Sequence, residues 1–239
     1  MTQCSIIVTC ASLRELSETE AAILSRSELR RADEFKASRR RRQYLSARAL
    51  LRNTLQQFTG GSAASHALTT EDKGKPVCAG GPAVSIAHSG NLVVCAAADR
   101  GDIGVDIEVP GRRRNVSGIA ENYFAADEVE WLATQPEDRF YMLWVLKEAW
   151  LKAKGTGIAG GLDRLRCIVT PPGIEARISD EPPPALSLHT IDDALVGVAT
   201  TATPRTAVTI NRWDSLSGPF DQSGDTRLIA TTYLPDQRA

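Results

Sequence analysis

The chain has 239 residues, of which 42% are hydrophobic and 24% charged, and its formal net charge is −1. Such a chain is long enough for one large domain or two small ones, each with its own core. The near-zero charge does not suggest a generally basic nucleic-acid binder or a strongly acidic solvating protein. No apolar run approaches membrane-spanning length, so we expect no membrane segment.

The cysteines show no C-x-x-C spacing, and with only three histidines in the chain a zinc site has little support. The odd number of cysteines also argues against a disulfide framework. We therefore expect a reducing, cytoplasmic setting. The five cysteines are Cys4, Cys10, Cys78, Cys95 and Cys167.

Two helices are expected first along the chain. Residues 16–35 are predicted to be mostly helical, with Ser17 as the N-cap and Glu20 completing a capping box. In a second helix, apolar residues recur at helical spacing until Gly60 and Gly61 end it.

Three strands are expected next, at residues 83–87, 92–98 and 103–109. Turn residues at 89–91 and 99–102 separate them, which predicts an antiparallel meander.

The second half of the chain repeats the order of helices followed by strands. Helices are predicted at 116–124, 126–134 and about 139–154, and strands at 167–170, 185–189, 195–200 and 207–210. This order fits an α+β fold of two similar halves, residues 1–102 and 103–213, followed by a polar tail at 214–239.

Two acidic residues alternate with apolar ones in the predicted third strand. Asp106 and Glu108 should lie on one face, roughly 7 Å apart, while Val105, Ile107 and Val109 face the core. The pattern alone also fits a solvent-facing edge strand that happens to carry two acids.

The longest predicted helix carries Trp144-Val145-Leu146-Lys147-Glu148-Ala149-Trp150-Leu151-Lys152, and apolar residues surround it almost completely. We therefore expect it to be buried, with Glu148 and Lys152 partly desolvated at positions i and i+4. On an exposed helix the same pair would be an ordinary surface ion pair. The Lys147 stem could pack while its head reaches solvent.

Basic residues and one histidine complete the set of candidate residues. His88 stands at the mouth of a predicted hairpin, and a lone histidine is more often structural than functional. The basic run could be a solvated helix face or a phosphate-binding surface. It consists of Arg30, Arg31, Lys36, Arg39, Arg40, Arg41, Arg42, Arg48 and Arg52.

In order and spacing, three motifs resemble the signature of 4′-phosphopantetheinyl transferases, most closely the surfactin-synthetase-activating, long monomeric type. The motifs are His88-Ser89-Gly90, Gly104-Val105-Asp106-Ile107-Glu108, and W-x-x-K-E-x-x-x-K from Trp144 to Lys152. The resemblance extends to Gly74-Lys75-Pro76 and to Arg48-x-x-x-Arg52. The sequence departs from the pattern at Ala87, where serine is usual, and at Glu28, where relatives can be basic.

This resemblance implies a pseudo-dimeric fold whose first half binds coenzyme A and whose second half binds Mg²⁺ and is catalytic. The implied reaction moves 4′-phosphopantetheine to a serine of an apo acyl or peptidyl carrier protein and releases adenosine 3′,5′-bisphosphate. Asp106, Glu108 and Glu148 would hold the metal. Glu148, or else Glu108, would be the base, and Lys152 would act on the leaving group.

Further residues are assigned by the same resemblance. Arg31, Lys75, His88 and Ser89 are expected to contact coenzyme A, and Arg39 to Arg42 to be solvated. Arg112, Arg113 and Arg114 are expected to meet the carrier protein. Short relatives form trimers with sites between subunits, but this chain is long enough to build its site between its own halves, so we expect a monomer.

The basic helix and the acidic strand would also fit two other classes of protein. A nucleic-acid-binding module that uses the basic helix should show interleaved aromatic residues, but only Phe35 and Tyr44 are there. Another Mg²⁺-dependent phosphotransferase would normally show a G-x-x-x-x-G-K-[ST] loop, which the sequence lacks.

Overall fold

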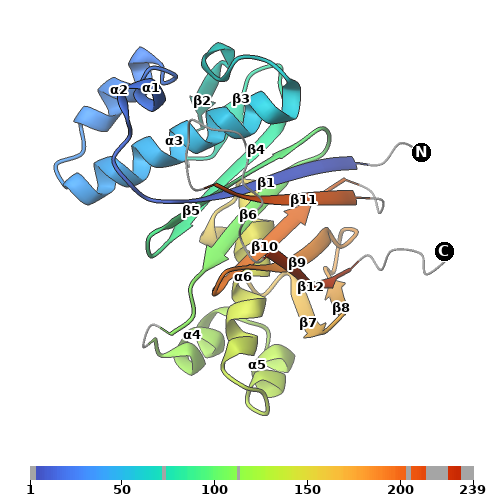
Figure 1. The fold of residues 1–239 in the computed structure, drawn as a ribbon. Coiled ribbons are helices and arrows are strands. Elements are labelled where there is room, and N and C mark those ends of the chain that lie inside the picture. The colour runs from blue at the N-terminus through green and yellow to red at the C-terminus, as the bar shows by residue number, and fades with distance from the viewer. Residues whose placement is uncertain (1–3, 72–73, 112–113, 203–205, 214–225, 233–239) are drawn as a thin grey trace.

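The computed structural model describes residues 4–71, 74–111, 114–202, 206–213 and 226–232. It shows a mixed α+β fold with two sheet-containing halves, which confirms the predicted fold class (Figure 1). The layers run from α3 (Ser38–Thr59) through one sheet and then a second sheet to α6 (Asp138–Lys154).

The first sheet is built around two strands that run in opposite directions, β1 and β5. Its strand order is β11 (Thr206–Trp213), β1 (Cys4–Ser12), β5 (Leu92–Ala98), β4 (Ala83–Ser89). Helix α3 covers its outer face with α1 (Glu18–Ala21) and α2 (Arg26–Asp33). A separate two-stranded ribbon is formed by β2 (Leu68–Thr70) and β3 (Pro76–Cys78).

The second sheet begins at the acidic strand. Its order is β6 (Ile103–Glu108), β10 (Ala194–Thr200), β9 (Ala185–Ile191), β12 (Thr226–Thr231), β8 (Gly173–Arg177), β7 (Arg166–Thr170). The short helices α4 (Val116–Tyr123) and α5 (Ala126–Leu132) precede α6. Among the described residues, no helix is both long and apolar enough to cross a membrane.

Strand alternation produces three apolar cores. Along β5, Val93 and Cys95 face the helices of the first half, whereas Val94 and Ala96 face the second sheet. The same period places Val105 and Ile107 of β6 in the core between the sheets, as predicted. A third core lies between α6 and the second sheet.

Two glycines allow α6 to lie very close to the second sheet. A Cβ atom at Gly104 of β6 would lie 1.8 Å from the carbonyl oxygen of Ala149, and one at Gly197 of β10 would lie 2.4 Å from that of Val145. Gly197 is the register partner of Asp106. This close approach brings the acidic face of β6 against the helix that carries Glu148.

Capping residues explain where the first helices begin. The predicted capping box of Ser17 and Glu20 is confirmed, but it starts a helix of only four residues. Ser25 and Glu28 form a second box that begins α2, so residues 16–35 are mostly helical as predicted but are divided between two helices. The end of α3 at Gly60 is confirmed, because this glycine adopts a left-handed C-cap with φ of 73°.

The predicted meander is correct only for its first two strands. β4 and β5 form an antiparallel hairpin, but β6 pairs with β10 in the other sheet. β4 meets β6 through side chains instead: the Ser85 and Ser89 hydroxyls accept hydrogen bonds from the backbone N–H groups of Val105 and Val109. The acidic strand therefore lies where the two sheets meet.

Two C-terminal strands also differ from the sequence prediction. β11, which was assigned to the second half, pairs in parallel with β1 of the first sheet. Residues 226–231 were placed in a polar tail, but they form β12, which pairs with β9 inside the second sheet. The predicted boundary between residues 102 and 103 therefore does not separate the two sheets completely, because β11 lies beyond it in the sequence but belongs to the first sheet.

Lys147 does not reach solvent, so the prediction that its head would do so is wrong. Its side chain is fully buried, and its ammonium donates to Glu128 at 2.7 Å and to the carbonyl oxygens of Leu162 and Leu165. The other Glu128 oxygen accepts from the backbone N–H of Cys167 at 2.8 Å. This buried ion pair joins α5, α6 and β7.

His189 gives the fold a dependence on pH. It is buried on β9, its Nε2 lies 2.8 Å from the Ser187 hydroxyl, and burial lowers its pKa to about 4. The unfolded chain therefore takes up a proton near pH 6.5, whereas the folded protein resists it until about pH 4. Between pH 7 and 4 we expect the free energy of unfolding to fall by about 3 kcal/mol from this residue.

Urea unfolding at pH 7 and pH 4, compared between the wild type and His189→Gln, checks this expectation. The variant should lose less stability over the same range. An equal pH dependence in the two proteins would show that His189 titrates normally.

Candidate active site

The site is built on the face of β6 that is turned toward α6. Asp106 and Glu108 are 7% and 8% exposed, so the alternative of a solvent-facing edge strand is wrong. Two carboxylates that are buried side by side disfavour each other's ionised form and need compensating charges.

Lys152 of α6 supplies the compensating charge for Asp106. Its ammonium donates to Asp106 Oδ1 at 2.5 Å, so this lysine reaches across from α6 to β6. Burial raises the pKa of Asp106, and the positive charge of Lys152 opposes that rise.

Glu108 is held from two other directions. The Ser89 hydroxyl, at the end of β4, donates to its Oε2 at 2.9 Å. Arg114 donates to both of its carboxylate oxygens, at 2.9 and 3.4 Å. Of the three arginines predicted to meet the carrier, Arg114 therefore pairs with Glu108, while Arg112 and Arg113 lie outside the described residues.

Glu148 lies one helical turn before Lys152. Its Oε1 atom is buried and has no hydrogen-bond partner in the described part of the chain. Burial raises its pKa, the charges of Asp106 and Glu108 raise it further, and Lys152 opposes them. A carboxylate with an unused oxygen and a raised pKa is suited to accept a proton.

The same carboxylates are the candidate ligands of a metal ion. Within the described ranges, no group of three or more His, Cys, Asp or Glu side chains is close enough to hold an ion. The donor set is nevertheless one that suits Mg²⁺, because it consists of carboxylate oxygens, one of them unpartnered. Lys152 and Arg114 occupy the positions of counter-charges to Asp106 and Glu108.

A cavity of about 920 Å³ extends between α2, α3 and β4. Its wall includes residues of the β2–β3 ribbon, and Lys152 lines it next to the carboxylates. Its charged and aromatic lining residues are Glu28, Arg31, Phe35, Arg40, Tyr44, Arg48, Glu71, His88 and Lys152.

The basic side chains of this cavity fall into two groups. His88 belongs to one: burial lowers its pKa, and the positive charges of Lys152 and Arg40 lower it further. Tyr44 marks the other: burial raises its pKa, while the charges of Arg48 and Arg31 oppose the rise. The first group lies beside the carboxylates and the second lies between α2 and α3.

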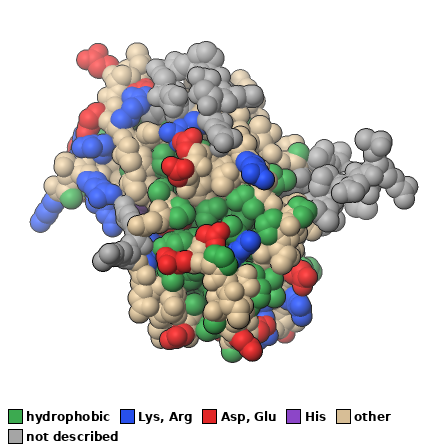
Figure 2. Space-filling model, turned by 60° about the horizontal axis from the view of Figure 1, so that its bottom comes forward, with side chains coloured by type: hydrophobic (Ala, Val, Ile, Leu, Met, Phe, Trp, Pro, Cys, Tyr) green, Lys and Arg blue, Asp and Glu red, His purple; other side chains and the backbone are tan. Residues whose placement is uncertain are grey.

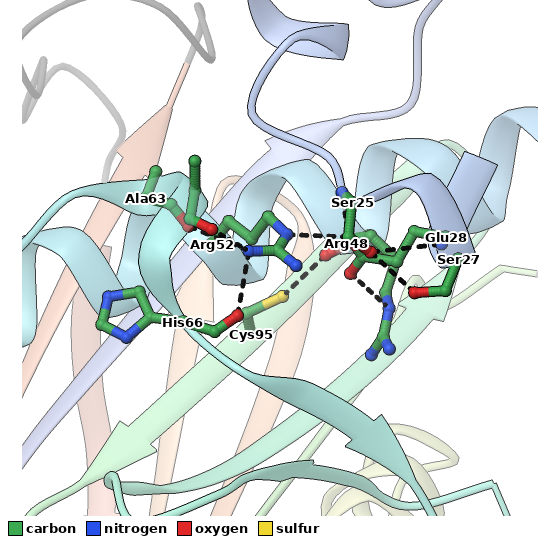
Figure 3. Close-up of polar contacts among 10 residues, drawn as sticks. Ser25, Ser27, Glu28, Arg48, Arg52, Ala63, His66 and Cys95 are labelled. Carbon is green, nitrogen blue, oxygen red and sulfur yellow. Dashed lines mark hydrogen bonds and ion pairs between the residues drawn. The ribbon is translucent and has the colours of Figure 1, made fainter.

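Arg48 of the second group is paired with the buried Glu28 (Figure 3). Glu28 is buried and faces two arginines: Arg52 Nε donates to it at 2.8 Å, and Arg48 Nε lies 3.1 Å from its other oxygen without hydrogen-bond geometry. The Nη1 atom of Arg52 donates in addition to the carbonyl oxygens of Ala63 and His66. Two arginines thus share one buried carboxylate, and Arg48 is the one of the two that lines the cavity.

The structure brings together Asp106, Glu108, Glu148 and Lys152, and it puts Ser89 on Glu108. Arg31 and His88 line the cavity as well. Lys75 is absent from the described residues that line it, because its ammonium donates to the carbonyl oxygen of Ala153 at 2.7 Å.

Sequence reasoning did not assign Arg40 or Arg48 to the coenzyme, although Arg48 belongs to the Arg48-x-x-x-Arg52 motif. Arg40, predicted to be solvated with its neighbours, lines the cavity. Arg41 and Arg42 do make exposed ion pairs, with Asp33 and Glu15. Figure 2 shows basic side chains gathered at the left edge, where α2 and the start of α3 lie in Figure 1. Helical spacing alone could not have separated Arg48 from the outward residues, because it lies seven positions after Arg41, on nearly the same side of the helix.

Comparison with known proteins agrees with this arrangement. A profile of the 4′-phosphopantetheinyl transferase superfamily matches residues 102–199, and one of the 4′-phosphopantetheinyl transferase N-terminal domain matches residues 19–98. The 4′-phosphopantetheinyl transferase HetI of Nostoc sp. is 32% identical over 160 residues, which is 63% of this chain and 67% of HetI.

Two Bacillus proteins are also similar to this chain. The 4′-phosphopantetheinyl transferase psf-1 of Bacillus pumilus is 35% identical over 147 residues, 58% of this chain and 61% of the relative. Sfp of Bacillus subtilis is 35% identical over 102 residues, 40% of this chain and 44% of Sfp. The chain belongs to the 4′-phosphopantetheinyl transferase superfamily.

Proposed function

We propose that this chain transfers the 4′-phosphopantetheine group of coenzyme A to a serine of an apo acyl or peptidyl carrier protein. The observation that carries the proposal is the position of Lys152, which pairs with Asp106 of the carboxylate group and also lines a cavity that Arg31, Arg40 and Arg48 line with it. The comparisons support neither the nucleic-acid-binding alternative nor another phosphotransferase.

Magnesium fits the carboxylate end of the site. Asp106, Glu108 and Glu148 would hold it, and the unpartnered Glu148 oxygen supports this assignment. When bound, Mg²⁺ offsets negative charge on the phosphorus under attack and on the leaving oxygen. Lys152 and Arg114 balance the carboxylates from the protein side.

The protein's own groups account for the proton and for the leaving group. Glu148 takes the proton of the carrier serine, directly or through a water. Its pKa is raised and so lies closer to neutral pH than that of an ordinary glutamate, which suits a general base. Lys152 neutralises the departing adenosine 3′,5′-bisphosphate, because it lies between the carboxylates and the cavity. His88 donates to a phosphate oxygen.

The two cation groups of the cavity match the two separate phosphate groups of coenzyme A. The pyrophosphate contains the bond that breaks, so it lies with His88, Arg40 and Lys152 beside the carboxylates. The 3′-phosphate on the ribose then lies with Arg31 and Arg48 between α2 and α3.

Arg48→Met should therefore remove most of the preference for coenzyme A over 3′-dephospho-coenzyme A. Loss of a charge-assisted hydrogen bond to a phosphate corresponds to roughly 10- to 100-fold in the ratio of kcat/KM values. Arg42→Met is the matched control on the same helix, because Arg42 pairs with exposed Glu15. An unchanged preference in Arg48→Met would place the 3′-phosphate elsewhere.

The carrier surface and the cellular setting stay proposals. Arg112, Arg113 and Arg114 are proposed to attract an acidic carrier. The contribution of Arg114 should be the smallest one, because its charge is paired with Glu108. Five free, buried cysteines support a reducing, cytoplasmic setting. A monomer fits a site formed by α6, β6 and the first half of one chain.

The transfer itself is tested with coenzyme A, Mg²⁺ and a panel of purified apo carriers. The expected result is the mass of one phosphopantetheine group added to at least one carrier serine. No added mass on any fatty-acid, polyketide or peptide-synthetase carrier would contradict the proposed function.

A further inference from the structure

The C-terminal end of α6 is fastened by a residue from the other half of the chain. The last four carbonyl groups of a helix have no partner within it and carry partial negative charge. Gly155 ends α6 in the left-handed conformation, with φ of 69°, and its N–H returns to Leu151 and Lys152. Ala153 offers one of the remaining carbonyl groups, and it accepts from Lys75 at 2.7 Å.

Lys75 makes two more contacts around this point. Its ammonium lies 3.8 Å from Asp102 Oδ1, just before β6 begins. Its Cδ lies 3.4 Å from the position that a Cβ on Gly155 would take, so its stem packs against the end of α6. One side chain therefore joins the β2–β3 ribbon, the start of β6 and the last turn of α6.

These three segments carry the parts of the candidate site. β6 bears Asp106, α6 bears Glu148 and Lys152, and Gly74 and Pro76 beside Lys75 line the cavity. Lys152 directly precedes the residue whose carbonyl Lys75 holds. A shift of this turn would change the distance between Lys152 and Asp106, which now form an ion pair at 2.5 Å.

We infer that Lys75 is a positioning residue, which fixes the last turn of α6 and through it holds Lys152 against Asp106 and the coenzyme cavity. This inference rests on the proposed function for the role of Lys152. It differs from the coenzyme contact predicted by resemblance, which would require the ammonium to leave Ala153 and Asp102.

The test compares Lys75→Met, which keeps the stem and removes the charge, with Lys75→Arg and Lys154→Met. Lys154 is the matched control, because it lies on the same turn but pairs with Glu181 of the second half. In Lys75→Met we expect faster amide exchange at 152–157. We also expect kcat to fall about tenfold or more, with the dissociation constant of coenzyme A within about twofold. Lys75→Arg should restore most of the rate.

A double variant separates positioning from direct action. In a Lys152→Ala background, Lys75→Met should lower kcat by less than about twofold more, because its effect passes through Lys152. A coenzyme dissociation constant raised tenfold at unchanged kcat would overturn the inference, and so would unchanged amide exchange. Amide exchange does not depend on the transfer reaction. A wild-type protein that modifies no carrier would therefore contradict the proposed function, while the exchange measurement would still show whether Lys75 fixes the last turn of α6.

Discussion

Replacing Asp106, Glu108 or Glu148 by alanine is expected to lower the rate of carrier modification by about a hundredfold or more. Each substitution withdraws a carboxylate from the group proposed to hold Mg²⁺, and Glu148→Ala also removes the proposed base. The measurement is the initial rate of mass addition to an apo carrier at saturating coenzyme A and Mg²⁺. Glu175→Ala, an exposed acid on β8, is the control and should keep the wild-type rate.

The same series distinguishes a lost metal site from a damaged fold. Burial and the neighbouring acids raise the pKa of Glu148, so at neutral pH its ionised form costs stability. Glu148→Gln should therefore melt no lower than the wild type while it transfers far more slowly. Binding of Mn²⁺, followed by electron paramagnetic resonance, should weaken in all three alanine variants. Wild-type rates in the presence of EDTA would exclude the metal assignment.

Lys147→Met is expected to destabilise the protein by about 3–5 kcal/mol, because it leaves the Glu128 carboxylate buried without its cation. Loss of the lysine also frees the carbonyl oxygens of Leu162 and Leu165 and removes the ammonium that lies 4.8 Å from the Phe124 ring centre. Urea unfolding at pH 7 measures the change. The exposed pair of Arg166 and Asp127 is the control, and Arg166→Met should cost less than about 1 kcal/mol.

The double variant Lys147→Met, Glu128→Leu should regain part of this loss, since no unpaired charge remains in the core. Recovery should be incomplete, because the backbone N–H groups of Ala125 and Cys167 then lose their acceptor. A single variant that loses less than about 1 kcal/mol would mean that water or another group satisfies Glu128.

The amino-acid sequence by itself determined the local features of this protein. Strand period placed Asp106 and Glu108 on one face, and helical period placed Glu148 and Lys152 on one side of a buried helix. Gly155 ended α6 where predicted. The three motifs also indicated the family. These features follow from residues a few positions apart, whose side-chain directions are set by backbone geometry alone.

Only the tertiary structure decided which segments meet. β6 joined the second sheet and β11 returned to the first, because pairing between distant strands depends on the packing of whole faces. Lys147 and Lys75 both looked available to solvent or ligand, but one is paired inside the core and the other holds the end of α6. Arg48 faces the cavity because Glu28, twenty residues earlier, fixes it there. A charge acquires its role from its partners, and those partners are neighbours only after the chain has folded.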